Sequence, residues 1–294
     1  MPDTESSLRH EQIGELEALS IQHPRFSARL FLQGAHLTHY APNGQENWLW
    51  VSPEAQYRQG RAIRGGVPVC WPWFGDPARN PQAVSHQIST PAAHGFARHQ
   101  LWTLATVEET DDQVHVVLTL DASQGYEHQW SGQARAQAAF TFTSESCQIE
   151  LVTENVGAKP LALSQALHTY LPVTDIATAA VHGLEGAAYL DTLDGWQRKQ
   201  QQGAVRFVGE TDRIYLQHGH LQLATGDQRR VLLGEGSGSA VVWNPGPEKA
   251  ARLSDFGAED WRRMVCIETA NAADDCATLP PGGQTRLALM LQNG

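Results

Sequence analysis

The feature that most constrains this fold is a long succession of short segments in which apolar and polar residues alternate. In residues 113–120, for example, Val114, Val116, Leu118 and Leu120 fall on one face of an extended chain. Turn signals separate these segments, and helical periodicity never extends beyond one or two turns. More than a dozen such segments without alternating helices predict an all-β, antiparallel sandwich.

We expect one domain spanning residues 1–294, in which the first twenty residues form a leading strand or a loose N-terminal arm. Gly34 interrupts the segment 28–40, which predicts a strand with a bulge or a close backbone approach. A short helical turn is expected near residues 254–261. The other predicted strands are residues 47–51, 101–108, 136–143, 147–154, 161–170, 178–181, 187–190, 205–208, 220–223, 230–233, 240–243, 264–268 and 286–291.

Composition and charge restrict the classes of partner. The formal net charge of −11 argues against nucleic acids and anionic membrane surfaces. No apolar run approaches the roughly 20 residues of a membrane helix, and residues 1–7 lack the pattern of a secretion signal, so we expect a cytoplasmic protein. The cysteines are scattered, and we expect reduced, mostly buried thiols with neither a disulfide nor zinc.

The segment 161–170 carries the first candidate for chemistry. Its period of two places leucines on one face and Ala162, Ser164, Ala166, His168 and Tyr170 on the other. A face of small side chains suggests a floor on which another molecule lies, because packed sheet faces usually carry larger residues. A half-buried structural histidine is the alternative for His168.

A second candidate is Glu268, which ends the apolar segment 264–268 and lies either at a solvent-exposed rim or facing a site. Carboxyl and imidazole groups have ordinary pKa values of roughly 4.3 and 6.5, which suits acid–base chemistry. Whether Glu268 and His168 meet does not follow from their positions in the sequence.

Three further charged residues lie beside glycines or in a turn-like segment. Arg64 and Arg98 each adjoin a glycine, which lets a ligand approach the backbone closely, so they either clamp a phosphate or carboxylate or pair with a structural carboxylate. Asp212 by default caps a turn.

Metal and nucleotide sites find little support. His218 and His220 have metal-ligand spacing, but residues 221–226 supply no acidic ligand. Neither a Gly-x-Gly-x-x-Gly motif nor a phosphate-cradling Gly-Lys-Ser/Thr loop occurs, so we expect no metal and no cofactor.

An ordered set of motifs resembles the glucose-6-phosphate 1-epimerases, or hexose-6-phosphate mutarotases, of the aldose 1-epimerase superfamily. Each motif alone is weak, but together they run in the family's order from about residue 28 to the C-terminus. They are Ile63-Arg64-Gly65-Gly66-Val67-Pro68, Trp71-Pro72-Trp73-Phe74-Gly75, His94-Gly95-Phe96-Ala97-Arg98, Ala166-Leu167-His168-Thr169-Tyr170, Glu210-Thr211-Asp212-Arg213-Ile214-Tyr215, Val241-Val242-Trp243-Asn244-Pro245 and Cys266-Ile267-Glu268.

The resemblance implies a galactose mutarotase-like β-supersandwich whose concave face binds a sugar phosphate, with no cofactor. It implies that His168 and Glu268 are the catalytic acid and base of a reaction that interconverts hexose 6-phosphate anomers. The substrate-binding residues that it implies are Arg64, His94, Arg98 and Asp212.

Several alternatives stay open at this point. Some members of the family have glutamine where this chain has Ala93, so the preferred hexose is not determined. The cleft could belong to a non-catalytic sugar-phosphate-binding sandwich or to an epimerase of unphosphorylated sugars. Trp71, Trp73 and Trp243 either stack on the sugar or fill the core. We expect a monomer, because no interface segment stands out.

Overall fold

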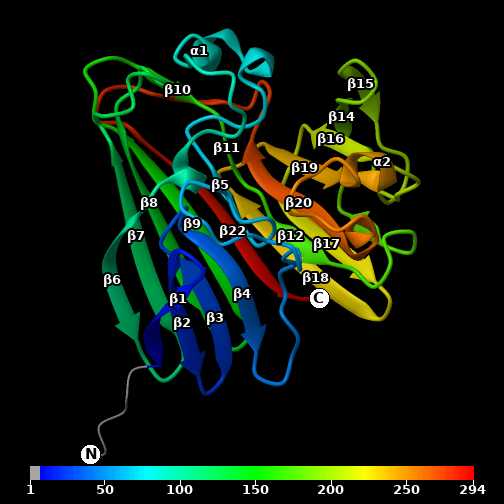
Figure 1. Cartoon of the computed structure of the whole chain (residues 1–294). Helices are drawn as coiled ribbons and strands as arrows, with labels where there is room; N and C mark the ends of the chain where they lie inside the picture. The colour runs from blue at the N-terminus through cyan, green and yellow to red at the C-terminus, as the bar shows by residue number, and fades with distance from the viewer. Residues whose placement is uncertain (1–6) are drawn as a thin grey trace, which may run out of the picture.

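The computed structural model describes residues 7–294, whose regular secondary structure is almost entirely antiparallel β-strand (Figure 1). Two eight-stranded sheets and a four-stranded sheet contain nearly all of them. This architecture confirms the prediction of an all-β antiparallel sandwich.

The four-stranded sheet, here the N-terminal sheet, is built from hairpins in chain order. Its strands are β1 (Leu8–Ile13), β2 (Leu16–His23), β3 (Phe26–Phe31) and β4 (His36–Pro42). Of the two alternatives predicted for the first twenty residues, a leading strand or a loose arm, residues 8–20 therefore form strands. Residues 1–6 lie outside the described residues.

The back sheet has eight strands, four of which follow one another in the chain between residues 103 and 155. In spatial order its strands are β13 (Ala180–His182), β17 (His220–Thr225), β18 (Gln228–Glu235), β22 (Gln284–Asn293), β9 (Ser146–Asn155), β8 (Ala134–Phe142), β7 (Val114–Ala122) and β6 (Thr103–Glu109). Val114, Val116, Leu118 and Leu120 are all buried on one face of β7, as their alternation predicts.

The second eight-stranded sheet is here called the pocket sheet, because a cavity opens on its outer face. In spatial order its strands are β15 (Gln197–Gln200), β14 (Ala188–Asp191), β16 (Thr211–Tyr215), β19 (Ser239–Asn244), β20 (Met264–Asn271), β11 (Gln165–Leu167) and β5 (Val69–Cys70), with β12 (Tyr170–Pro172) also paired to β20. The remaining elements are the strand pair β10 (Leu161–Leu163) and β21 (Ala277–Leu279), the short helices α1 (Gln82–Ser85) and α2 (Gly246–Ala250), and 3-10 turns at Pro77–Arg79, Ala97–His99 and Asp260–Arg263.

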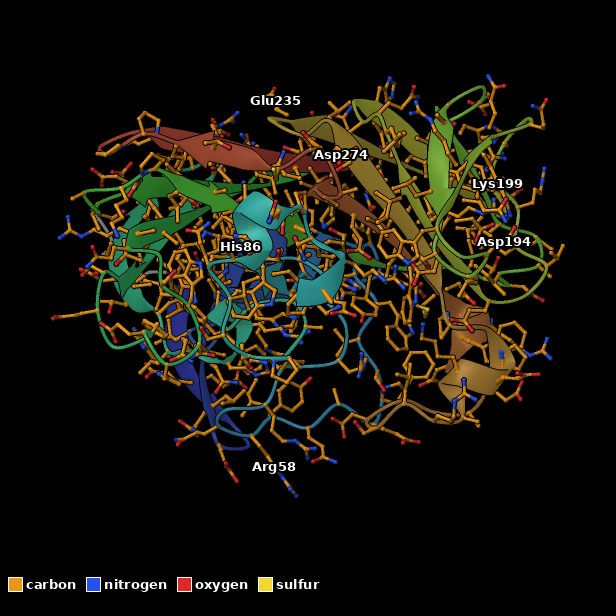
Figure 2. All side chains as sticks on the ribbon, turned by 90° about the horizontal axis from the view of Figure 1, so that it is seen from above. Arg58, His86, Asp194, Lys199, Glu235 and Asp274 are labelled. Carbon is orange, nitrogen blue, oxygen red and sulfur yellow. The ribbon has the colours of Figure 1, made fainter. Side chains whose placement is uncertain are left out.

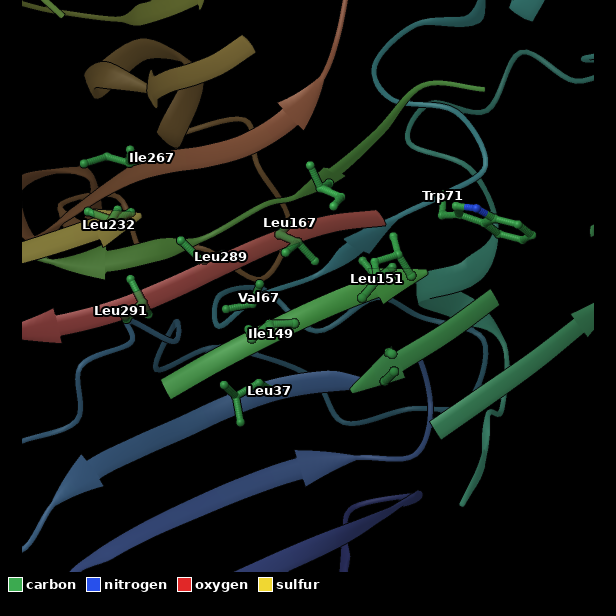
Figure 3. Packing of buried hydrophobic residues seen from close by; sticks show 14 of the residues in the cluster. Leu37, Val67, Trp71, Ile149, Leu151, Leu167, Leu232, Ile267, Leu289 and Leu291 are labelled. Carbon is green, nitrogen blue, oxygen red and sulfur yellow. The ribbon is translucent and has the colours of Figure 1, made fainter. Parts of the chain in front are cut away.

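One hydrophobic core joins the three sheets. Figure 3 shows Leu37 of the N-terminal sheet, Ile149 and Leu289 of the back sheet, and Leu167 and Ile267 of the pocket sheet in the same cluster. All five side chains are fully buried, and burying a leucine or isoleucine contributes roughly 1.5–3 kcal/mol. The pocket sheet is therefore anchored through its inner face, which leaves its outer face for other side chains.

The segment around Gly34 differs from the single bulged strand predicted for residues 28–40. Gly34 has φ +80° and Ala35 has φ 46°, so the chain reverses there and β3 and β4 form a hairpin. The predicted close approach is confirmed, because a Cβ on Gly34 would lie 2.9 Å from the carbonyl oxygen of Arg98.

Three other predicted elements are also wrong in detail. Residues 47–51 form only a bridge at Val51, because the Asn47 side chain takes the backbone bonds that a strand partner would take. Residues 205–208 likewise form only a bridge, at Val205. The helical turns lie at α2 and Asp260–Arg263, so the prediction of a turn at 254–261 holds only at its end.

Candidate active site

Alternation along two central strands of the pocket sheet decides which of their side chains face the cavity. On β20, Val265 and Ile267 enter the core, so Glu268 faces outward. On β19, Val242 is buried in the core, and Trp243 lines the cavity. The strand pairing that fixes the core thus also fixes the outward residues.

Loops from distant parts of the chain surround this outer face and close a cavity of about 630 Å³. That volume is within the range of roughly 300–1,000 Å³ typical of small-molecule sites. One wall is the turn of the β14–β15 hairpin, which contributes Thr192 and Trp196. Figure 2 shows Asp194 and Lys199 together at the outer end of that hairpin, where their ion pair of 2.7 Å closes the turn.

The cavity also holds the six residues that sequence analysis selected. Its lining includes Arg64, His94, Arg98, His168, Asp212 and Glu268. Arg64, His94 and His168 lie in loops, and Arg98 lies in the 3-10 turn Ala97–His99. Asp212 and Glu268 lie in strands β16 and β20, so the fold brings together segments that are far apart in the sequence.

His168 and Glu268 form a close pair at the floor. Nε2 of His168 lies 3.4 Å from Oε1 of Glu268, and their side chains are 12% and 2% exposed. His168 follows β11, its backbone N–H donates to the carbonyl of Pro68, and its ring stacks on Tyr170 with centroids 4.9 Å apart. The histidine is thus buried but faces the cavity, and Glu268 faces the site rather than a solvent-exposed rim.

Burial disfavours the charged form of both groups. It lowers the pKa of His168 well below 6.5, and the positive charges of Arg98 and Arg64 add to this effect. Burial also raises the pKa of Glu268 well above 4.5, with a further contribution from the charge of Asp212. Burial thus favours the neutral imidazole and the protonated carboxyl group, whereas an acid–base pair uses a protonated His168 beside a Glu268 carboxylate.

Arg64 and Arg98 bring positive charge to the same cavity without ion-pairing partners. Nη1 of Arg64 donates to the Tyr170 hydroxyl at 3.5 Å, and Nη2 of Arg98 donates to the carbonyl of Ala93 at 3.1 Å. Among residues 7–294 neither guanidinium forms an ion pair with a carboxylate, so the structural alternative for them is wrong. Two unpaired guanidinium groups suit an anionic ligand.

Unsatisfied polar atoms cluster in this site. In the part of the chain that the structure describes, the buried atoms without a hydrogen-bond partner include Nε of Arg64, Nε of Arg98, Nδ1 of His168 and Oε2 of Glu268. Buried polar groups are normally paired, and their exceptions occur at functional sites.

His94 is held in a conformation that most residues avoid. Its φ is 65°, its Nδ1 accepts a hydrogen bond from the N–H of Gly75, and its ring lies 5.7 Å from that of His168. Burial lowers the pKa of His94 to about 3, so the ring is neutral. The neutral ring can therefore donate a hydrogen bond from Nε2 to a ligand.

Asp212 lies in strand β16 rather than in a turn, so the turn-capping alternative is wrong. Its register opposite Trp243 on β19 directs it to the cavity, and a carboxylate oxygen lies 4.0 Å from Nζ of Lys249. Burial raises the pKa of Asp212, whereas the ammonium of Lys249 lowers it.

The predicted floor of small residues is wrong. Ser164 is fully buried, and its hydroxyl accepts from the N–H of Phe74 and donates to Asn80, which interrupts the predicted strand 161–170. Ala166 is also fully buried and packs with residues such as Cys70. Ala162 is 6% exposed and lines a different pocket. The floor is instead formed by larger side chains.

Sequence reasoning assigned no role to Tyr170 or Lys249. The period of two placed Tyr170 on the same face as His168, and both side chains line the cavity. No local signal identifies Lys249, because it reaches the cavity only through the fold of α2.

The remaining candidates serve the core or other contacts. Trp71 and Trp73 are fully buried, whereas Trp243 lines the cavity. The thiols of Cys70, Cys147 and Cys266 are buried, as expected. Nε2 of His218 lies within hydrogen-bond distance of the Thr269 hydroxyl, and residues 7–294 contain no group of three or more metal-ligating side chains. Within the same range, no helix is long and apolar enough to cross a membrane.

Comparison with known proteins identifies the family of this chain. Residues 17–292 match the model of the aldose 1-epimerase family. The Escherichia coli (strain K12) protein named "Putative glucose-6-phosphate 1-epimerase" is 34% identical over 271 residues, which cover 91% of this chain and 87% of that one. A protein of the same name from Cenchrus ciliaris is 31% identical over 276 residues, with 88% and 79% covered.

A solved structure agrees with these relatives. The crystal structure described as "a putative mutarotase (YeaD) from Salmonella typhimurium" superimposes with a TM-score of 0.88 at 30% identity, covering 100% of this chain and 96% of that one. The chain therefore belongs to the aldose 1-epimerase family, and it is an epimerase, an enzyme of the isomerase class.

Proposed function

We propose that this epimerase interconverts the α and β anomers of a hexose 6-phosphate, with glucose 6-phosphate as the leading candidate. The observation that carries the proposal is the convergence, in one cavity, of two guanidinium groups without ion-pairing partners and a buried imidazole–carboxyl pair. Guanidinium groups bind a phosphate, and an imidazole–carboxyl pair can move protons. The names of the relatives point to the same substrate.

In the proposed mechanism, Glu268 removes the proton from the anomeric hydroxyl while His168 donates a proton to the ring oxygen. The C1–O5 bond breaks, and the ring opens to the free aldehyde. Rotation about C1–C2 and the reverse transfers close the ring with inverted C1. Each acid–base contribution is worth on the order of 10²- to 10⁴-fold in rate.

The proposed mechanism uses the charged form of each group, whereas burial favours the neutral forms. A neutral His168 with protonated Glu268 holds the same number of protons as a protonated His168 with a Glu268 carboxylate, so one transfer across the 3.4 Å gap converts them. A bound sugar favours the charged form, because its hydroxyl donates to the carboxylate and its ring oxygen accepts from the imidazolium.

The other residues hold the substrate in this proposal. Arg64 and Arg98 bind the phosphate, and Asp212 and His94 bind sugar hydroxyls. A phosphate dianion on the two arginines also offsets the positive charge that lowers the pKa of His168. The arginines therefore favour hexose phosphates over free sugars.

Exchange spectroscopy by NMR tests this function. Wild-type protein at catalytic concentration is added to equilibrated glucose 6-phosphate, and cross-peaks between the two anomeric protons report the exchange rate, with galactose as the control sugar. We expect saturable acceleration for glucose 6-phosphate and a much smaller effect on galactose. Equal acceleration of both would instead identify an epimerase of unphosphorylated sugars.

A His168→Ala variant tests the proposed acid. We expect its exchange rate to fall by at least about 100-fold. An undiminished rate would remove His168 from the mechanism.

Three broader expectations stay predictions: a single domain, a monomer and a cytoplasmic location. Light scattering during gel filtration measures the mass in solution. A single cooperative unfolding transition, observed by both tryptophan fluorescence and circular dichroism, is the result expected for one domain.

A further inference from the structure

Tyr170 lies between Arg64, a proposed phosphate-binding residue, and His168, the proposed acid. Its hydroxyl accepts a hydrogen bond from Nη1 of Arg64 at 3.5 Å, and its ring stacks on that of His168, with centroids 4.9 Å apart and planes 13° apart. On another side the ring lies 5.8 Å from that of Trp50 at 23°. Tyr170 is only 4% exposed, so its ring is packed between these neighbours.

The backbone around Tyr170 connects the same segments. The N–H of Tyr170 donates to the carbonyl of Gly66, and the N–H of Trp50 donates to the carbonyl of Tyr170. The N–H of His168 donates to the carbonyl of Pro68. A shift at Arg64 therefore acts on a segment that is hydrogen-bonded directly to the one carrying His168.

The contact between Arg64 and Tyr170 is weak. At 3.5 Å it is at the long end for a hydrogen bond, and the phenol is neutral because burial holds the pKa of Tyr170 far above its usual value of 10. A bound oxyanion would fix the guanidinium and so define the position of the Tyr170 hydroxyl. The stacked imidazole would then be held against the ligand.

We infer that Tyr170 is a positioning residue that couples anion binding at Arg64 to proton transfer at His168, so that a phosphate dianion accelerates ring opening in addition to holding the substrate. This inference rests on the proposed function. It differs from simple anchoring, in which the phosphate would contribute only to substrate affinity.

A substrate divided into two pieces separates coupling from anchoring. D-xylose has the pyranose ring without the carbon that carries the phosphate, and inorganic phosphite supplies the dianion. The rate of xylose anomerisation is measured by polarimetry over a series of phosphite concentrations, and the rate without protein is subtracted because phosphite itself catalyses the reaction. Coupling between sites is typically worth about 5- to 150-fold, and we expect activation by phosphite in this range for the wild type.

Tyr170→Phe removes the hydroxyl but keeps the stacked ring. In this variant we expect phosphite activation below about threefold, and for glucose 6-phosphate a fall in kcat with KM changed by less than about threefold. Tyr40→Phe is the matched control, because it removes a fully buried hydroxyl that donates to Thr143 far from the cavity. A purely structural loss would affect both variants, whereas loss of coupling would affect only Tyr170→Phe.

Each outcome is decisive. If the wild type anomerises glucose 6-phosphate but phosphite does not activate xylose, the phosphate only anchors, and the inference is wrong while the proposed function stands. Full activation in Tyr170→Phe would exclude Tyr170 from the coupling. If the wild type fails to anomerise glucose 6-phosphate at all, the proposed function fails and the inference falls with it.

Discussion

Replacement of Glu268 by glutamine separates proton transfer from binding at this site. The glutamine side chain has almost the same shape as a protonated glutamic acid, and Glu268 is only 1% exposed, so the packing of β20 should persist. Glutamine can still hydrogen-bond to a sugar hydroxyl, but it cannot accept its proton. We expect kcat for glucose 6-phosphate to fall by about 10²- to 10⁴-fold, equivalent to about 2.7–5.5 kcal/mol in the barrier.

The assay is anomeric exchange by NMR at several substrate concentrations. KM should change by less than about threefold, because the arginines that we propose for the phosphate are intact. Glu150→Gln is the matched control: this glutamate pairs with Arg286 on the back sheet, and its loss should leave the exchange rate unchanged. An exchange rate for the Glu268 variant within about threefold of the wild type would refute the assigned role.

The same substitution should also stabilise the protein. Because burial raises the pKa of Glu268 in the folded state, its contribution to stability is full below the ordinary pKa of 4.5 and is lost as pH rises through the folded-state value. Glutamine has no such dependence. We expect the variant to gain on the order of 1 kcal/mol over the wild type at neutral pH, because it removes a buried ionisable group. Urea unfolding at pH 4.5 and pH 8 checks this, and a difference that shrinks toward high pH would contradict it.

Further predictions concern the arginines, the buried histidine and the sugar ligand. Arg64→Ala and Arg98→Ala should each lower kcat/KM for glucose 6-phosphate by about 10- to 150-fold, the loss of a charged hydrogen bond of roughly 1.5–3 kcal/mol, while the rate with free glucose changes little; equal losses on both sugars would argue against a phosphate site. Burial lowers the pKa of His36 to about 4, so its contribution to stability is full above about pH 6.5 and is lost as pH falls toward 4. Between pH 7.5 and pH 5 the free energy of unfolding, measured by urea titration, should fall by about 2 kcal/mol because of this histidine. The His36→Gln variant should not show this decrease. Asp212→Asn should raise KM for glucose 6-phosphate without preventing folding, as circular dichroism would report, and an unchanged KM would exclude a sugar contact.

The alternation of apolar and polar residues predicted most of the fold, because the inward face of each strand must be apolar. It correctly assigned the buried face of β7 and the outward face of Glu268 on β20. It failed where side chains compete with strand pairing. Asn47 and Ser164 both bond backbone N–H groups through their side chains, and each interrupts a segment predicted to be one strand.

The candidate site was predictable in its residues but not in its geometry. The motifs selected His168 and Glu268, yet the 3.4 Å distance between them depends on long-range pairing of β11 with β20. The pKa shifts of the two groups were not predictable either, because they follow from burial of both side chains. Likewise, Lys249 approaches Asp212 only because α2 folds over the end of the pocket sheet.

A crystal structure of the Glu268→Gln variant with glucose 6-phosphate bound would test the proposed mechanism most directly. We expect phosphate oxygens within about 3 Å of the guanidinium groups of Arg64 and Arg98. We also expect the ring oxygen within about 3 Å of His168 and the anomeric hydroxyl beside residue 268. A sugar bound in the opposite direction, with its phosphate at His168 or outside the cavity, would contradict the proposed mechanism.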